Sequence, residues 1–132
     1  MPEKGWGSAF LQKQVDYLLK HDVEGLMTNH YCEDAEMITF EFLCQGREAI
    51  GRYLGVDEPA KAGQILGMTM NHYFESDDTI IFTCTIDSEK LGVFVARDAL
   101  VFKEGKIWKH IALTIPPESD LKIFEAVAQG KK

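Results

Sequence analysis

The chain has 132 residues, of which 45% are hydrophobic and 27% are charged. This length and composition predict one globular domain, 1–132, with a core large enough to fold without a disulfide or a structural metal. The 14 basic residues against 21 acidic residues give a formal net charge of -7, which disfavours binding to nucleic-acid phosphates. No secretory leader and no apolar stretch of about 18 residues is visible, so we expect a cytoplasmic protein without a membrane partner.

The three cysteines, Cys32, Cys44 and Cys84, are odd in number and widely spaced. They form no CxxC pair, which argues against a disulfide framework and against a zinc site. We therefore expect reduced thiols.

Two helices are predicted near the amino terminus. Apolar residues recur at three- and four-residue spacing over 10–19 and form one stripe, with Ser8 as the expected N-cap. Asp22 is the expected N-cap of a second, short helix that runs through Tyr31.

A strand and a third helix are predicted next. The strand covers 36–40, and the helix follows Gly46. Pro59 and Gly63 are expected to end this helix.

From residue 64 the apolar period changes from about 3.6 residues to about 2, the period of a strand. Four such runs, separated by short polar turns, predict an antiparallel meander with strands over 65–74, 79–87, 91–102 and 107–115. A last amphipathic helix is predicted over about 118–129. Helices followed by a long sheet indicate an α+β fold, with the helices packed on one face of a curved antiparallel sheet.

The turn between the last two strands determines their register. A two-residue type I′ turn would place Glu104 at positive φ, which a non-glycine residue disfavours. We therefore predict a type I turn at Lys103 and Glu104, followed by Gly105 as a G1 bulge.

This register places Phe102 opposite Lys106 and Asp98 opposite His110. One face then carries Ala96, Asp98, Leu100, Phe102, Trp108, His110, Ala112 and Thr114, and the other carries Val95, Arg97, Ala99, Val101, Ile107, Lys109, Ile111 and Leu113. Both faces are apolar, which a sheet with one face in water would not be. Helices on one face and a second subunit on the other explain this, so we expect a homodimer through the outer sheet face.

Asp98 and His110 are the candidate catalytic residues. Asp98 interrupts the apolar run 93–102, where a carboxyl group is exposed, paired, or held neutral as a hydrogen-bond donor by desolvation. A neutral carboxyl group in an apolar cavity can act as an acid or stabilise an oxyanion. His110, opposite Asp98, could share its proton and act as an acid or base. The alternative is a purely structural contact between the two side chains.

Other clusters are weaker candidates. His30, Glu33 and Asp34 have helical spacing, but a solvated helix end explains them better than a metal site does. Met68 and Met70 fill the core or line an apolar cavity.

The segments YLLKHDVEGLM (17–27), YCEDAEMITF (31–40), GREAIGRYL (46–54) and ALVFKEGKIWKH (99–110) resemble, in order and spacing, the nuclear transport factor 2-like superfamily. The resemblance covers roughly 8–115 and is greatest to the ketosteroid-isomerase-like and SnoaL-like polyketide-cyclase branch. It implies a cone, a cystatin-like α+β barrel, whose strongly bent sheet and helices enclose an apolar pocket. It also implies a dimer through the outer sheet face. The branch mostly works without a cofactor, so we expect neither a cofactor nor a metal.

The resemblance carries over to individual residues only in part. The protonated aspartate of ketosteroid isomerases aligns with Asp98. Their general-base aspartate aligns with Thr39, which cannot abstract a carbon-bound proton, and their oxyanion-hole tyrosine aligns with Gln14. Tyr53, on a pocket-lining helix, could replace the missing phenol. No catalytic set of the family is complete, and steroid isomerisation is disfavoured.

Three hypotheses remain open at this point. The first is a cofactor-free isomerase-, cyclase- or dehydratase-like enzyme for a small hydrophobic molecule, the second a non-catalytic binding module for such a molecule, and the third a dimeric association module. The expected ligand pocket consists of Gln14, Leu18, Thr39, Tyr53, Met68, Met70, Phe82, Cys84 and Ala112.

Overall fold

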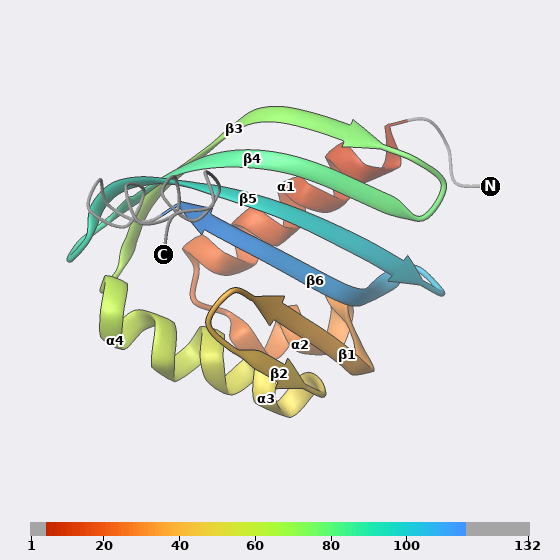
Figure 1. The fold of residues 1–132 in the computed structure, drawn as a ribbon, viewed down its shortest axis with the longest axis horizontal. Helices are drawn as coiled ribbons and strands as arrows, with labels where there is room; N and C mark the ends of the chain where they lie inside the picture. Colours follow the sequence, from red (N-terminus) through yellow and green to blue (C-terminus); the bar gives the residue numbers. More distant parts are fainter. Residues whose placement is uncertain (1–4, 116–132) are drawn as a thin grey trace, which may run out of the picture.

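Helices lie on one face of a curved six-stranded sheet in the computed structural model, which describes residues 5–115 (Figure 1). The elements are α1 (Trp6–Leu19), α2 (Val23–His30), β1 (Tyr31–Thr39), β2 (Leu43–Gln45), α3 (Arg47–Arg52), the π-helical segment η1 (Tyr53–Asp57), α4 (Glu58–Ala62), β3 (Ile65–Glu75), β4 (Thr79–Ser88), β5 (Gly92–Lys103) and β6 (Lys106–Ile115). The predicted α+β fold is confirmed. The helix predicted over 118–129 lies outside the described residues.

The strand order in the sheet is β2-β1-β6-β5-β4-β3. The meander of β3 to β6 is antiparallel, as predicted, and β2 pairs antiparallel with β1. The one exception among the described strands is β1, which runs parallel to β6. The sheet is therefore mixed, and its first strand lies beside its last.

The first helix begins earlier than predicted. Gly5, at φ 88°, is the N-cap, so Ser8 lies inside α1 and does not cap it. The first turn packs against the sheet: a Cβ added at Gly7 would lie 2.3 Å from the hydroxyl oxygen of Tyr73. This long-range contact extends α1 past the local cap signal.

The predicted cap of α2 is confirmed, because the Asp22 carboxylate accepts a hydrogen bond of 3.0 Å from the main-chain NH of Gly25. The end of α2 differs from the prediction. Tyr31 has extended backbone angles and is the first residue of β1, not the last residue of the helix.

The third helical region ends at Gly63, as predicted, but Pro59 does not interrupt it. Pro59 lies in the first turn of α4, directly after the π-helical segment η1, and does not end the helix. The helix ends at Gly63, which adopts φ 70°.

The β5–β6 turn corrects the predicted one. Lys103 pairs with Lys106, and both intervening residues have positive φ, 55° at Glu104 and 80° at Gly105, as in a type I′ turn. The left-handed conformation of Glu104 costs about 1–2 kcal/mol. The twist of a type I′ turn matches the right-handed twist of the strands, which offsets this cost.

A bulge in β6 also changes the register. Phe102 pairs with Ile107 but Val101 pairs with Lys109, which leaves Trp108 without a partner residue on β5. The two-residue turn already places Ile107 in the core, where it is fully buried, instead of on the predicted outer face, and the bulge keeps His110 on the inner face. The Trp108 ring lies under the Lys109 ammonium group, 4.5 Å from its centroid.

The predicted pairing of Asp98 with His110 is consequently wrong. Asp98 lies opposite Ala112, and His110 lies opposite Leu100. The shift is an even number of residues, so the alternation of side chains is kept and Asp98 and His110 still share the inner face.

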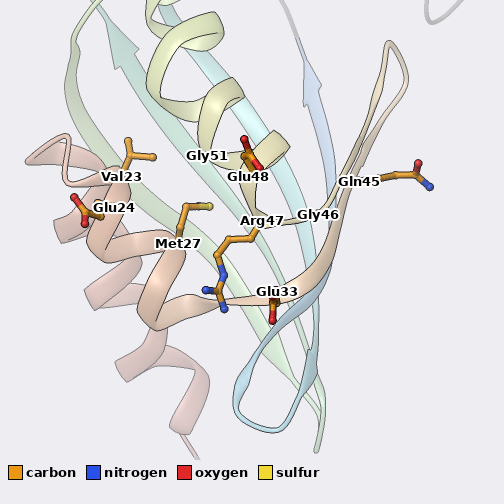
Figure 2. A pocket seen from close by; sticks show the side chains of 9 residues that line it. All are labelled: Val23, Glu24, Met27, Glu33, Gln45, Gly46, Arg47, Glu48 and Gly51. Carbon is orange, nitrogen blue, oxygen red and sulfur yellow. The ribbon is translucent and has the colours of Figure 1, made fainter.

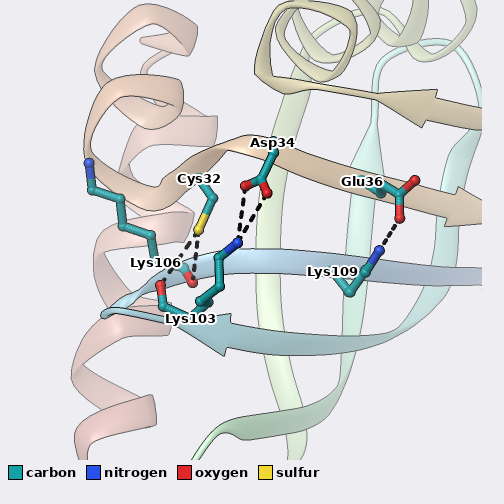
Figure 3. A network of polar contacts seen from close by, with 6 residues as sticks. All are labelled: Cys32, Asp34, Glu36, Lys103, Lys106 and Lys109. Carbon is teal, nitrogen blue, oxygen red and sulfur yellow. Dashed lines mark hydrogen bonds and ion pairs between the residues drawn. The ribbon is translucent and has the colours of Figure 1, made fainter.

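Polar contacts join β1 to the β5–β6 hairpin on the outer side (Figure 3). Asp34 pairs with Lys103 at 3.0 Å, and Glu36 pairs with Lys109. The Cys32 thiol donates to the main-chain carbonyl of Lys103 at 3.5 Å. Partly exposed ion pairs contribute little stability. Because each of these two acidic residues of β1 faces a lysine of the hairpin, however, the pairs favour one register of β1 on β6.

The core lies between the helices and the inner face of the sheet. Its fully buried large side chains are Tyr31, Leu26, Met37, Ile50, Ile80, Leu100, Ile107 and Cys84. The three cysteines form no disulfide in the structure. None of the helices within 5–115 is long and apolar enough to cross a membrane.

The type I′ turn predicts the effect of substitutions at Glu104. Asparagine tolerates positive φ better than glutamate, so E104N should raise the free energy of unfolding by roughly 0.5–1 kcal/mol. Urea denaturation measures this change. E104Q removes the same charge without improving the backbone preference and is the control. An equal gain in both variants would show that charge, not backbone strain, limits stability at this turn.

Candidate functional site

Asp98 and His110 meet on the inner face of the sheet. His110 Nε2 lies 3.4 Å from Asp98 Oδ1, and each side chain is only 12% exposed. The contact runs diagonally between β5 and β6, because the two residues occupy neighbouring cross-strand pairs. The structure thus brings together the two candidate catalytic residues, although through a different register.

A chain of buried polar side chains continues from His110 toward the helices. The Tyr31 hydroxyl lies 2.8 Å from His110 Nδ1, and Gln14 Nε2 donates to the same hydroxyl at 3.2 Å. Gln14 Oε1 accepts a hydrogen bond of 2.7 Å from His30 Nδ1. The four side chains come from α1, α2, β1 and β6. Their hydrogen bonds satisfy groups that would otherwise be buried at a cost of about 1–3 kcal/mol each.

A second carboxyl group, Glu58 of α4, belongs to the same site. Burial raises the pKa of Glu58, the negative charge of Asp98 raises it further, and His110 and a hydrogen bond from Tyr53 oppose this shift. Glu58 therefore lies within electrostatic reach of Asp98 and His110. A carboxyl group with a raised pKa beside an ionisable partner is a recurrent feature of acid–base sites.

The two tyrosines at this site remain neutral phenols. Burial is the main cause that raises the pKa of Tyr31 and the pKa of Tyr53, and nearby carboxylates raise both further. Each phenol can therefore act as a hydrogen-bond donor near neutral pH.

Sequence patterns did not identify Glu58, Tyr31 or His30 as site residues. Glu58 precedes a proline that was expected to end a helix, and Tyr31 was expected to end another helix. Polar residues flank Tyr31 in the sequence, so no local pattern marks its side chain as buried.

Most of the predicted pocket residues lie on the inner side of the molecule. Phe82, Asp98, Ala112 and Thr39 form one cross-strand row over β4, β5, β6 and β1. The others are buried or half-buried against the core: Gln14, Leu18, Tyr53, Met68, Met70 and Cys84. Burial raises the pKa of the Cys84 thiol to about 11.

Thr39 has its hydroxyl engaged within its own turn. Its Oγ1 accepts hydrogen bonds of 3.0 Å from the NH groups of Glu41 and Phe42 and donates to the Phe42 carbonyl. The hydroxyl therefore stabilises the β1–β2 turn.

Two surface hollows lie away from Asp98 and His110. One, of about 710 Å³, lies among α2, α3, β1 and β2 and is lined by Val23, Glu24, Met27, Glu33, Gln45, Gly46, Arg47, Glu48 and Gly51 (Figure 2). The other, of about 600 Å³, lies beside the amino-terminal end of α1 and includes His30, Phe10 and Phe102. Neither is the predicted ligand pocket.

Residues 5–115 contain no candidate metal site. No group of three or more His, Cys, Asp and Glu side chains in this range could hold a metal ion.

No protein-family model matches the sequence, and no curated protein matches it significantly. Solved structures do match. A nuclear transport factor 2-like protein of unknown function from Cytophaga hutchinsonii superposes with a TM-score of 0.68 over 94% of this chain and 99% of its own, at 11% identity. The chain has the nuclear transport factor 2-like fold.

Two further structures agree with this fold. A candidate polyketide cyclase from Sinorhizobium meliloti has a TM-score of 0.63 at 17% identity, over 74% of this chain and 86% of its own. A protein from Catenulispora acidiphila with a ketosteroid isomerase-like fold was solved in complex with trimethylamine. It has a TM-score of 0.62 at 13% identity, over 73% of this chain and 77% of its own. The fold implied by the resemblance in the sequence is therefore confirmed. At these identities the likeness shows the nuclear transport factor 2-like fold alone, a fold that hosts many unrelated functions.

The burial of His30 predicts a loss of stability in acid. Burial, together with the charge of Lys13, lowers the pKa of His30 from 6.5 to about 4. The unfolded chain therefore binds more protons than the folded one between these values, and stability falls as the pH drops through this window, by about 3 kcal/mol in total. Urea denaturation at several pH values measures the slope.

The variant H30Q should remove much of this pH dependence, because glutamine can donate to Gln14 without titrating. H72Q, at the exposed His72 of β3, is the matched control and should keep the wild-type slope. An unchanged slope in H30Q would show that other groups cause the acid sensitivity.

Proposed function

We propose that the chain is a cofactor-free enzyme that moves a proton on a small hydrophobic molecule bound at the inner face of the sheet. The observation that carries the proposal is the contact of Asp98 with His110, both largely buried, within electrostatic reach of the half-buried Glu58. Three ionisable side chains at one place on an apolar wall cost folding energy, and proton transfer gives a reason for that cost.

In this site Asp98 and Glu58 exchange protons with the substrate, and His110 is the proton partner of Asp98. The raised pKa of Glu58 favours its neutral form, which is the form of a general acid. The negative charge of Asp98 adds to burial in raising the pKa of Glu58, which favours the neutral form of Glu58 further. An isomerase-, cyclase- or dehydratase-like reaction requires such a pair.

The substrate class follows from the walls of the proposed pocket. Leu18, Met68, Met70, Phe82 and Cys84 would contact an apolar body, and methionines adapt to different shapes. Gln14, Thr39, Tyr53 and Ala112 complete the proposed lining. Steroid isomerisation stays disfavoured, because Thr39 replaces the family's general base and has its hydroxyl committed to a turn.

A non-catalytic binding module is the second candidate. It is favoured by Thr39, since a missing general base at that position leaves a pocket that can hold a ligand without transforming it. In that case the polar side chains only orient the ligand.

We also propose a homodimer through the outer sheet face. An apolar row crosses all six strands there: Phe74, Ile81, Ala99, Ile111, Ile38 and Leu43 are successive partners. The five longer strands, about 4.8 Å apart and about ten residues long, present an area of about 800 Å², which is what one partner buries in a stable complex. A cytoplasmic location fits the reduced cysteines and remains part of the proposal.

The enzyme proposal predicts catalysed hydrogen exchange. A panel of small hydrophobic ketones and enols in deuterated water should gain deuterium at carbon in the presence of the protein, measured by mass spectrometry. D98N should lower the rate by at least about 100-fold, because it removes a proton-exchanging group. D87N, at an exposed aspartate of β4, is the matched control.

A folded D98N protein that exchanges at the wild-type rate would remove Asp98 from catalysis. Ligand binding by the wild-type protein without any exchange would favour the binding module instead. Thermal unfolding of each variant separates these results from a loss of fold.

The dimer proposal predicts a change in mass for one outer-face variant. Ile81 is exposed in the single chain, so I81K should convert a dimer into a monomer without disturbing the core. Sedimentation velocity measures the mass. V56K, at the exposed Val56 of η1 and off the sheet, is the control and should stay dimeric. A monomeric wild-type protein would contradict the proposal.

A further inference from the structure

The chain of hydrogen bonds from His30 to Asp98 has a direction, because each of its contacts has one donor and one acceptor. Gln14 is its starting point, because an amide oxygen can only accept and an amide nitrogen can only donate. Gln14 Oε1 faces His30 Nδ1, so His30 carries its proton on Nδ1. Gln14 Nε2 donates to the Tyr31 hydroxyl, so the hydroxyl proton of Tyr31 is free to point elsewhere.

The direction then determines the proton position on His110. The Tyr31 hydroxyl accepts from Gln14 and lies 2.8 Å from His110 Nδ1, so it donates to that nitrogen. His110 Nδ1 therefore carries no proton and accepts this hydrogen bond with its lone pair, and the neutral ring carries its proton on Nε2. That nitrogen is the one that faces Asp98 Oδ1 at 3.4 Å.

We infer that Gln14 and Tyr31 are positioning residues, which hold His110 as the Nε2–H tautomer so that Asp98 enters the reaction as the proton acceptor. The catalytic part of this inference rests on the proposed function. Asp98 Oδ1 takes the hydrogen bond from His110, and we assign Oδ2 to the substrate proton. Glu58, with the Tyr53 phenol donating to it, is then the complementary acid of the site.

Hydrogen bonds that ran in the opposite direction would give Asp98 a different chemical role. If the Gln14 amide were reversed, Tyr31 would donate to Gln14 and His110 Nδ1–H would donate to Tyr31. The bare Nε2 of His110 would then face Asp98, which would have to carry a proton itself. Asp98 would be an acid or an oxyanion donor, and His30 would carry its proton on Nε2. The two directions therefore differ at two histidines at once.

Packing around the chain supports a fixed arrangement. Tyr31 is fully buried, and Gln14 and His30 are nearly so. The His30 ring stacks on Phe10 with centroids 3.9 Å apart, and the Tyr31 and His110 rings stack at 6.1 Å. Side chains that packing already holds in place lose little further entropy when they form hydrogen bonds, so one direction can persist.

The test is a long-range proton–nitrogen correlation spectrum of the nitrogen-labelled full chain, recorded above the titration range of imidazole. Single histidine-to-glutamine variants assign the signals. We expect the Nε2–H pattern for His110 and the Nδ1–H pattern for His30. Nδ1–H at His110, or a mixture of tautomers at His110, would overturn the inference, and this wild-type result does not depend on any variant folding.

Two matched variants test the positioning role. Y31F removes the donor to His110 Nδ1 and should shift the His110 signals toward a mixture of tautomers. Y17F is the control, because Tyr17 also accepts a hydrogen bond, from Asn29 at 3.0 Å, and packs edge-on against His30 but lies outside the chain. It should leave His110 unchanged. His110 signals that are identical in Y31F and wild type would also overturn the inference.

The exchange assay separates this inference from the proposed function. If the protein catalyses exchange, folded Y31F should be at least about 10-fold slower than Y17F, because an imidazole of the wrong tautomer no longer supports its carboxylate. The expected tautomers together with no exchange in any protein would support the proton arrangement and contradict the enzyme proposal.

Discussion

The hydrogen bond between the Tyr31 hydroxyl and His110 Nδ1 is the interaction on which the rest of the site depends. Tyr31 is the first residue of β1 and is fully buried, so its hydroxyl must find partners inside the protein. It finds them in Gln14 of α1 and His110 of β6, which are 17 and 79 residues away in sequence. One buried hydroxyl therefore ties the first helix, the first strand and the last strand together, and it also orients the imidazole beside Asp98.

The position of His110 results from a compromise in the β5–β6 hairpin. The type I′ turn suits the twist of the strands but requires positive φ at Glu104. This turn places Ile107 in the core, and the bulge at Trp108 then adds one residue to β6, which keeps His110 on the inner face. The functional geometry thus depends on a local irregularity. Bulges often have this role, because they redirect side chains without breaking the sheet.

The two faces of the sheet serve different purposes. The inner face combines apolar packing with a small group of ionisable side chains, which is expensive in folding energy and suits chemistry on a bound molecule. The outer face carries an apolar row that crosses every described strand, which suits association with a second copy. Both properties come from the same alternation of side chains along the strands, which directs one set of residues to the proposed site and the other set to the proposed interface.

The sequence by itself determined the α+β class, the four-strand meander, the cap at Asp22 and the common face of Asp98 and His110. These features depend on local periodicity and local hydrogen bonding, and the common face survives any even shift of register. Only the tertiary structure decided that β1 lies parallel to β6, that the β6 bulge sets the register, and that Tyr31 and Glu58 join the site. Those features depend on contacts between residues far apart in the chain, where the cost of closing a loop and the fit of whole elements outweigh local preference.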